Sequence, residues 1–533
     1  MNRTRLLLVA LVAWIGVFLL TAAWVLATPI GNGPDESNHF AKAAATVRGQ
    51  WTGVPTGAQG ITTVHVPRAV TDPQGAVPCA ARDAAKSATC MPPFSTAAGD
   101  VEVPTGVGDY FPGYYLLVGW PTLLLDGAHG YLAVRLVSAL VTSALAAVVV
   151  LVGAALRYRH ALPAWAAVAV TPMTVYVGAL VNPSSVEIAG CAALAAVTWL
   201  VLHDGEGRRL RWWLTLLVVC GVVAGSMRTA SPLMVVVVVL GVLLTDVPRA
   251  VQLLRRRSVL TALGAAVVLL VPAVLWSAFV AGPAGYIPSS PERYGFVEGT
   301  LRTLALTPKW GEQMVGVFGW FDTTLPAWVV TAWAMGIGLV VLAGLAVRRR
   351  ALPGTVFLIA ATVLVPAVLQ GIGAAEYGII WQGRYGLPLL VATLLVVGLA
   401  ADRDVFRARA LRPFVVVVPV LAAVGQVVAF AVVLHRYAVG VSAPFASVFG
   451  AEAWHPFGGT VLAFVLLLVG LALAGGALAV STSASPGSVA LRSAVLRIDP
   501  DRPDGRRGAR TTVRPGPSAR GTRIRRRSGR STR

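Results

Sequence analysis

Long apolar stretches, separated by short polar segments, recur along almost the whole sequence. A stretch of about 20 apolar residues can cross a bilayer as a helix, and shorter stretches are accommodated inside a bundle. The pattern predicts about twelve membrane-spanning helices, near residues 5–27, 130–156, 161–181, 184–203, 212–227, 231–246, 258–281, 327–347, 353–372, 385–401, 413–434 and 457–480. We expect the first helix to remain as an anchor, because its apolar run is longer than that of a signal peptide.

The composition agrees with lipid as the main surroundings of the chain. Of the 533 residues, 56% are hydrophobic and 13% are charged, and this charged fraction is about half that of an average soluble domain. So few polar side chains cannot cover the surface of a water-soluble protein of this length. The predicted fold class is an all-α polytopic membrane protein, with one multi-span domain over residues 1–480.

The distribution of arginines predicts the orientation of the helices. If the N-terminus is cytoplasmic, every cytoplasmic loop is rich in Arg, whereas the short external turns contain only Arg228, Arg384 and Arg436. This asymmetry follows the positive-inside rule, so both termini are predicted to be cytoplasmic. Two long segments, residues 28–129 and 282–326, are then external.

The first external segment contains an apolar stretch and two cysteines. Residues 110–120 are too short to span, so we expect a short surface helix or a segment that re-enters the bundle. Cys79 and Cys90 share an oxidising compartment in this orientation, which favours a disulfide over two free thiols. Cys191 and Cys220 lie in apolar spans and are expected to be packing residues.

The segment 481–533 differs in composition from the rest of the chain. It contains 14 Arg and three Asp among Pro, Gly and Ser, which predicts a disordered cytoplasmic tail. Such a tail attracts anionic lipid headgroups, with each Arg near the surface contributing roughly 1 kcal/mol. The net charge of +21 also raises the alternative of nucleic acid, but the sequence has no nucleic-acid-binding motif or interleaved aromatic platform, so no nucleic-acid partner is predicted.

Ionisable side chains at membrane depth are costly, so each is a candidate for function. In this sequence they gather at the predicted external ends of the spans, and no comparable group lies at mid-bilayer. The candidates are Asp35, Glu36, His39, Arg135, Asn182, Glu187, Arg228, Asp322, Arg384 and Tyr385.

The adjacent carboxylates of Asp35 and Glu36 are the sharpest local feature. At a water–lipid boundary they suit a general base, ligands of a divalent cation such as Mg²⁺ or Mn²⁺, or both. The alternative is that Pro34-Asp35-Glu36 starts a helix, because Pro and acidic residues favour the first turn. We expect a helix over 35–47 in either case, with Asp35 and His39 on one face.

The external arginines have two interpretations. Arg384 suits a phosphate clamp through its planar set of donors, or it anchors the span together with Tyr385 in an aromatic belt. Arg228 has the same alternatives.

Three further candidates also leave alternatives open. Arg135 either contacts substrate or pairs with Glu187. Asn182 begins the next helix at a tight turn, and Asp322 either caps the following span or contacts substrate.

Four motifs together resemble a known family: Pro34-Asp35-Glu36-x-x-His39, Asn182-Pro183-Ser184, Phe318-Gly319-Trp320-x-Asp322 and Gly383-Arg384-Tyr385-x-x-Pro388. Over roughly residues 5–475 the chain resembles the bacterial predicted membrane proteins called domain of unknown function 2142. That family in turn looks like the GT-C superfamily of glycosyltransferases, which take sugars from polyprenyl-phosphate carriers. The resemblance implies that Asp35 is the catalytic base, Glu36 its acidic neighbour and Arg384 the match to the carrier phosphate.

The expected function is transfer of a sugar from a polyprenyl-phosphate carrier to a glycan or lipid acceptor of the cell envelope, at the outer face of a bacterial plasma membrane. The sequence has no sizeable external C-terminal domain of the kind that often helps such enzymes to bind the acceptor. One alternative is a polytopic transporter or lipid flippase, which needs polar or broken helices near the bilayer middle. The other is a non-catalytic envelope-assembly protein.

Overall fold

Helices dominate the computed structural model of the protein, which describes residues 3–483 except 59, 76, 158, 206–208, 282–291 and 405–411. The helices are α1 (Arg3–Ala27), α2 (Glu36–Thr46), α3 (Gly113–Gly119), α4 (Gly127–Ala155), α5 (Leu162–Ala169), α6 (Pro172–Gly178), α7 (Pro183–Asp204), α8 (Leu210–Gly225), α9 (Ser231–Leu243), α10 (Val247–Leu254), α11 (Arg257–Phe279), α12 (Phe296–Ala305), α13 (Thr307–Gly316), α14 (Ala327–Leu345), α15 (Leu352–Tyr377), α16 (Leu387–Asp404), α17 (Arg412–Val439) and α18 (Gly459–Ser483). The strands are β1 (Val54–Pro55), β2 (Thr62–Pro67), β3 (Asp100–Thr105), β4 (Val317–Phe318) and β5 (Thr323–Thr324).

The predicted spans correspond to the observed helices. Among the described residues, ten helices are long and apolar enough to cross a membrane, and α8 is a shorter apolar helix. Together with α5 and α6 they account for all the predicted spans, so the fold class of an all-α polytopic membrane protein is confirmed. The five short strands were not predicted. The predicted disordered tail, apart from its first three residues, lies outside the described residues.

The span predicted at 161–181 is broken into α5 and α6. Pro172 has no backbone N–H and cannot continue the preceding helix, and the side chain of Thr171 caps the first turn of α6. The break frees the carbonyl of Val170, which accepts a hydrogen bond of 2.9 Å from Gln426 Nε2 on α17. The prediction of one continuous span over 161–181 is therefore wrong at this position, although a neighbouring side chain satisfies the freed backbone group.

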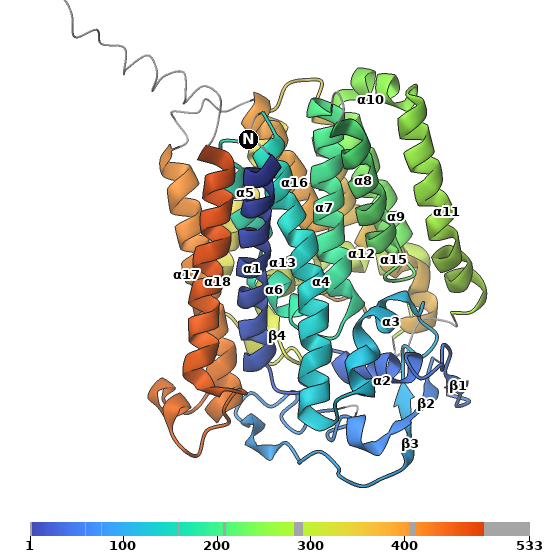
Figure 1. Cartoon of the computed structure of the whole chain (residues 1–533), viewed down its shortest axis with the longest axis vertical. Helices are drawn as coiled ribbons and strands as arrows, with labels where there is room; N and C mark the ends of the chain where they lie inside the picture. Colours follow the sequence, from blue (N-terminus) through green and yellow to red (C-terminus); the bar gives the residue numbers. More distant parts are fainter. Residues whose placement is uncertain are drawn as a thin grey trace, which may run out of the picture. The chain divides into compact units, whose positions relative to one another are not determined.

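Two helices form the centre of the bundle. Both α7 and α16 are buried along almost their whole length, and α7 packs against α4, α8, α9 and α16. At the periphery α1 lies beside α18 (Figure 1). A side chain at Gly16 or Gly470 would collide with the backbone of the opposite helix, so glycine permits this close approach.

The long segment after α1 folds into a layer at one end of the helices. The N-terminus and α10 lie at the opposite end (Figure 1). In this layer, β2 pairs antiparallel with both β1 and β3, with Thr62 opposite Thr105 and Pro67 opposite Asp100. Helix α2 packs against β2 and β3. We call this the sheet end of the bundle.

The predicted disulfide between Cys79 and Cys90 is confirmed, with Cα atoms 6.1 Å apart. The loop that it closes is held by Arg436, whose guanidinium donates to three backbone carbonyls of the loop. Cys191 and Cys220 are free and buried, as expected for packing residues.

The predicted surface helix within residues 110–120 is α3, which continues into the 3₁₀ helix η3 (Trp120–Leu123). One side of α3 is buried through Tyr114, Tyr115 and Val118. The opposite side and the residues that follow expose large apolar side chains: Leu116, Leu117, Trp120, Leu123, Leu124 and Leu125. A helix with one apolar exposed face is typical of an element that lies in the membrane interface.

We expect a spin label at Leu124→Cys to lie among lipid chains, because Leu124 is 75% exposed and an exposed leucine is stabilised by hydrocarbon. The measurement is electron paramagnetic resonance in lipid nanodiscs, with oxygen as the lipid-soluble and a nickel chelate as the water-soluble relaxant. Glu102→Cys, on the polar exposed strand β3, is the matched control. Equal access of the nickel chelate to both labels would contradict an interfacial α3.

Candidate functional site

The acidic pair after α1 is divided between two partners. Asp35 precedes α2 with a φ of 60°, a left-handed conformation that costs a residue other than glycine roughly 1–2 kcal/mol. Its side chain makes no capping hydrogen bond to α2; it is 44% exposed and pairs with Arg384. Glu36 is fully buried and pairs with Arg135. The predicted helix is confirmed, but helix capping accounts for neither carboxylate.

The Glu36–Arg135 pair is bidentate. Arg135 Nε donates to Glu36 Oε1 at 2.7 Å and Nη2 donates to Oε2 at 2.5 Å. The remaining donors of the guanidinium reach backbone carbonyls at the end of α1, those of Val25, Thr28 and Pro29. Glu36 Oε1 also accepts from the backbone N–H of Val181 at 3.0 Å.

This network fixes the start of α2 against its neighbours. It joins α2 to α4, to the end of α1 and to the turn before α7, and it is sealed from solvent. Of the two alternatives left open for Arg135, the pairing with Glu187 is therefore wrong. Glu36 is thus buried, whereas Asp35, the residue before it, is partly exposed.

Arg384 lies in the short 3₁₀ helix η6 (Gly383–Gly386), immediately before α16. Its Nη2 donates to Asp35 Oδ2, and also to Tyr385 Oη at 3.3 Å. The side chain is only 5% exposed, yet Nε and Nη1 have no hydrogen-bond partner among the described residues. Buried donors without partners are unusual and costly, so this guanidinium retains unused binding capacity beside Asp35.

Arg228, the other arginine predicted to be external near the site, contacts the same tyrosine ring as Arg384. The guanidinium carbon of Arg228 lies 4.5 Å from the ring centroid of Tyr385, and that of Arg384 lies 5.1 Å from it. Arg228 Nη1 donates to Ser184 Oγ at 3.2 Å. Glu187, which is buried, accepts a hydrogen bond of 2.6 Å from Ser231.

The electrostatics keep Asp35 ionised. Partial burial raises the pKa of its carboxyl, but the charge of Arg384, with smaller contributions from His39 and Arg228, outweighs burial and leaves the pKa below its usual value of 3.8. An opposite charge at this distance favours the ionised form. Asp35 is thus a carboxylate at neutral pH.

His39 lies one turn after Asp35 on α2, as predicted. Its Nδ1 is 2.8 Å from Tyr115 Oη, and its ring packs against those of Tyr115 and Tyr110. Burial lowers the pKa of His39 to about 3, with Asp35 opposing and the two arginines adding to the shift. The imidazole is therefore neutral at physiological pH.

Two candidates have structural partners instead. Asn182 caps α7, because its side chain accepts from the backbone N–H of Ser184 at 3.0 Å, as the turn motif predicts. Asp322 pairs with Arg436 at 2.9 Å and accepts from the backbone N–H of Arg82. The helix after it, α14, begins only at Ala327, so the prediction that Asp322 caps a span is wrong.

The predicted divalent-cation site does not fit the residues present. Among the described residues, no group of three or more His, Cys, Asp and Glu side chains is placed to hold a metal. Both oxygens of Glu36 are engaged by Arg135. Asp35 then remains as a single carboxylate already paired with a cation, whereas Mg²⁺ and Mn²⁺ favour several oxygen ligands.

Sequence reasoning overlooked several residues of this site. Tyr110, Tyr115, Ser184 and Ser231 surround the charged groups. Tyr110 and Tyr115 belong to the apolar stretch 110–120, which is predicted to lie at the surface or to re-enter the bundle but has no predicted part in the site. Hydroxyl residues at helix starts are common: Ser184 stands out only as part of the Asn182-Pro183-Ser184 motif, without a predicted role, and nothing local distinguishes Ser231.

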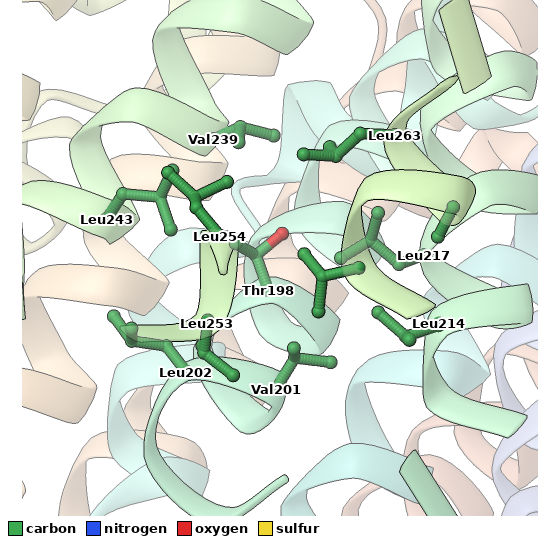
Figure 2. Close-up of a pocket in the computed structure, with 12 residues that line it drawn as sticks. Thr198, Val201, Leu202, Leu214, Leu217, Val239, Leu243, Leu253, Leu254 and Leu263 are labelled. Carbon is green, nitrogen blue, oxygen red and sulfur yellow. The ribbon is translucent and has the colours of Figure 1, made fainter. Parts of the chain in front are cut away.

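A cavity elsewhere in the bundle has no comparable chemistry. Figure 2 shows a cavity of about 40 Å³ between α7, α8, α9, α10 and α11. Its lining is aliphatic apart from Thr198, whose hydroxyl donates to the carbonyl of Leu194. We assign no function to this cavity.

The fold and the site together define a polytopic membrane protein with a charged, partly open site at the sheet end. A family model described as "Predicted membrane protein (DUF2142)" matches residues 18–393, which include Asp35, Glu187, Arg228 and Arg384. The chain belongs to this family of predicted membrane proteins.

Comparison with solved structures finds a similar chain in the crystal structure of ArnT from Cupriavidus metallidurans bound to undecaprenyl phosphate. The two are 16% identical with a TM-score of 0.43, and the match covers 93% of this chain and 81% of that one. No curated protein sequence matches the chain.

We expect Arg135→Gln to lower the free energy of unfolding by about 3–5 kcal/mol, because it leaves the carboxylate of Glu36 buried without its partner. The measurement is unfolding in mixed detergent micelles. Arg157→Gln is the matched control: the side chain of Arg157 is 74% exposed where it pairs with Asp204, and its loss should cost less than about 1 kcal/mol. Equal stability of the two variants would contradict an anchoring role for the buried pair.

Proposed function

We propose that this protein is a membrane glycosyltransferase, which moves a sugar from a polyprenyl-phosphate carrier to an acceptor hydroxyl with Asp35 as general base. The sheet end faces away from the cytoplasm in this proposal, as the arginine distribution predicts. The carrier phosphate then lies at headgroup depth, with its prenyl chain among the lipid-facing helices.

One observation carries the proposal: a buried guanidinium with unused donors lies beside an ionised, partly exposed carboxylate. The Nε and Nη1 atoms of Arg384 have no partner among the described residues, and Nη2 contacts Asp35. Guanidinium groups bind phosphate through several parallel hydrogen bonds. A phosphate at Arg384 would thus place the sugar that it carries next to the base.

The proposed reaction is a displacement at the anomeric carbon of the carried sugar. The acceptor oxygen forms a bond to this carbon while its proton passes to the carboxylate of Asp35. The bond between the anomeric carbon and the phosphate oxygen breaks, and its electron pair leaves with the polyprenyl phosphate. Arg384 and Arg228 stabilise the negative charge that develops on the leaving phosphate.

In this proposal Arg384 also links the binding of the donor phosphate to the basicity of Asp35. In the free protein its charge helps to hold the pKa of Asp35 low, which makes the carboxylate a weak base. A phosphate that shares the guanidinium reduces this attraction and adds a negative charge nearby, and both effects raise the pKa of Asp35. Its basicity would therefore increase when the donor is bound.

Glu36 has a supporting role in this proposal. Its two oxygens are taken by Arg135 and by a backbone N–H, which leaves it poorly placed to accept a proton from substrate. We propose that Glu36 positions Asp35, the residue directly before it in the sequence.

The rival function of a transporter rests on the break between α5 and α6. Transporters use broken helices whose freed backbone groups bind substrates or ions in a cavity. Here the freed carbonyl of Val170 accepts from Gln426, and the carbonyl of Val168 accepts from Trp333 Nε1 at 3.2 Å. These protein partners favour a structural role for the break.

We expect Asp35→Asn to lower the rate of sugar transfer by about 10²–10⁴-fold, the usual contribution of a general base, with little effect on binding of a polyprenyl phosphate. Asn is the suitable substitution because it tolerates the left-handed backbone at this position. The measurement is transfer from a radiolabelled polyprenyl-phosphate sugar by purified protein in nanodiscs, with Asp100→Asn on β3 as the charge-matched control.

Arg384→Ala should weaken polyprenyl-phosphate binding and transfer together, because it removes the phosphate donors. Arg384→Lys should restore part of the binding, since the charge returns without the planar set of donors. Transfer that survives in folded Asp35→Asn protein would exclude Asp35 as the base. Phosphate binding that is unchanged in Arg384→Ala would exclude the clamp.

The pH profile gives an independent check. The value of kcat/KM reports groups of the free enzyme, in which the pKa of Asp35 lies below 3.8 and that of His39 is about 3. Falling pH protonates the base only below about pH 4, so kcat/KM should be flat from about pH 5 to pH 8. An acidic limb near pH 6.5 that disappears in His39→Gln would show instead that a titrating histidine controls the rate.

A further inference from the structure

A cavity with polar and apolar lining lies at the sheet end. Its volume is about 230 Å³, and its lining comes from β1, β2 and the loop between them, from the segment that leads into α3, and from Ala281 after α11. The lining includes Pro55, Ile61, Thr62, Gly108, Asp109 and Tyr110.

The wall of this cavity is built by buried contacts. Lys42, which is fully buried on α2, donates to the carbonyls of Trp51 at 2.6 Å and of Gly108 at 2.5 Å. A Cβ atom at Gly53 or at Gly108 would come within about 2 Å of the Thr62 hydroxyl oxygen, at 2.1 and 2.0 Å. Only glycine permits this packing, so Gly53 and Gly108 both lie directly against Thr62 of β2.

Asp109 is also held in place. Its Oδ1 accepts from the backbone N–H of Gly53 at 3.1 Å, and its backbone carbonyl accepts from Trp276 Nε1 on α11 at 2.8 Å. Among the described residues no hydrogen bond occupies its second carboxylate oxygen, while the buried ammonium group of Lys42 lies within electrostatic reach of this carboxylate.

Tyr110 connects the cavity to the charged site. Its ring packs edge-on against that of His39, with centroids 6.1 Å apart. Its hydroxyl group lies close to the guanidinium of Arg228 and within the electrostatic reach of Asp35. Tyr110 thus belongs both to the lining of the cavity and to the surroundings of the charged site.

The lining has the chemistry that recognises hydroxyl groups. The carboxylate of Asp109 and the hydroxyl groups of Thr62 and Tyr110 supply hydrogen-bonding atoms, while proline, isoleucine and the tyrosine ring supply a larger apolar side. The described lining residues include no Lys or Arg, so the cavity does not suit a phosphate. Its volume is below the roughly 300–1,000 Å³ of pockets for drug-sized ligands, which limits it to a group about as large as one sugar ring.

We propose that this cavity is the acceptor subsite, and that it binds a polyhydroxylated ring whose free hydroxyl reaches Asp35 past Tyr110. Asp109 selects the acceptor by accepting hydrogen bonds from its hydroxyl groups. The proposal rests on the transferase function, in which Arg384 holds the donor phosphate and this cavity holds the second substrate.

The test measures two ligands on the full chain in nanodiscs. Binding of a panel of methyl hexopyranosides is measured by saturation-transfer-difference NMR. Binding of a polyprenyl phosphate is measured by native mass spectrometry. We expect at least one glycoside to bind in the millimolar range. Asp109→Asn should weaken the binding of this glycoside by about tenfold or more, because a hydrogen bond to a charged group is lost. This variant keeps the side-chain oxygen that accepts from Gly53, and Asp100→Asn is its matched control.

The two proposals fail separately. If wild-type protein binds the polyprenyl phosphate but none of the glycosides, or if Asp109→Asn and Asp100→Asn bind them equally, the acceptor subsite is refuted and the phosphate clamp stands. If glycosides bind but the phosphate does not, the transferase proposal fails on its donor side. Unchanged phosphate binding by Asp109→Asn shows that this variant is folded.

Discussion

The ion pair between Glu36 and Arg135 is the interaction on which the arrangement of the site depends. Both side chains are fully removed from solvent, and two buried charges are tolerated only when they are paired and fully hydrogen-bonded. The guanidinium meets this condition by also binding carbonyls at the end of α1. The pair therefore fixes the point at which the chain leaves the first span and starts α2.

This constraint separates two chemically similar neighbours. The turn that buries Glu36 forces Asp35 into a left-handed conformation and directs its carboxylate toward Arg384. One acid thus becomes part of the framework, whereas the other stays partly exposed beside a guanidinium with unused donors. Strain of this kind tends to persist where the surrounding structure over-determines it, often at functional sites.

The charged groups also divide the sheet end into two environments. Arg228 and Arg384 flank Tyr385 and suit an anion, whereas the cavity at Asp109 offers acceptors and apolar surface. Tyr110 belongs to both environments. An enzyme that joins an anionic donor to a neutral polyhydroxylated acceptor needs such a division, because each substrate must be desolvated by groups of complementary character.

The sequence by itself determined the membrane-spanning architecture and the layer in which the costly residues lie, because hydrophobic length and loop charge act locally along the chain. It favoured the disulfide between Cys79 and Cys90, which the structure shows. Only the tertiary structure decided which charges pair. Arg135 selects Glu36, 99 positions away, rather than Glu187, and Arg384 meets Asp35 across 349 positions. Pair choice depends on helix packing and on the geometry of the guanidinium, and neither leaves a periodic signal in the sequence.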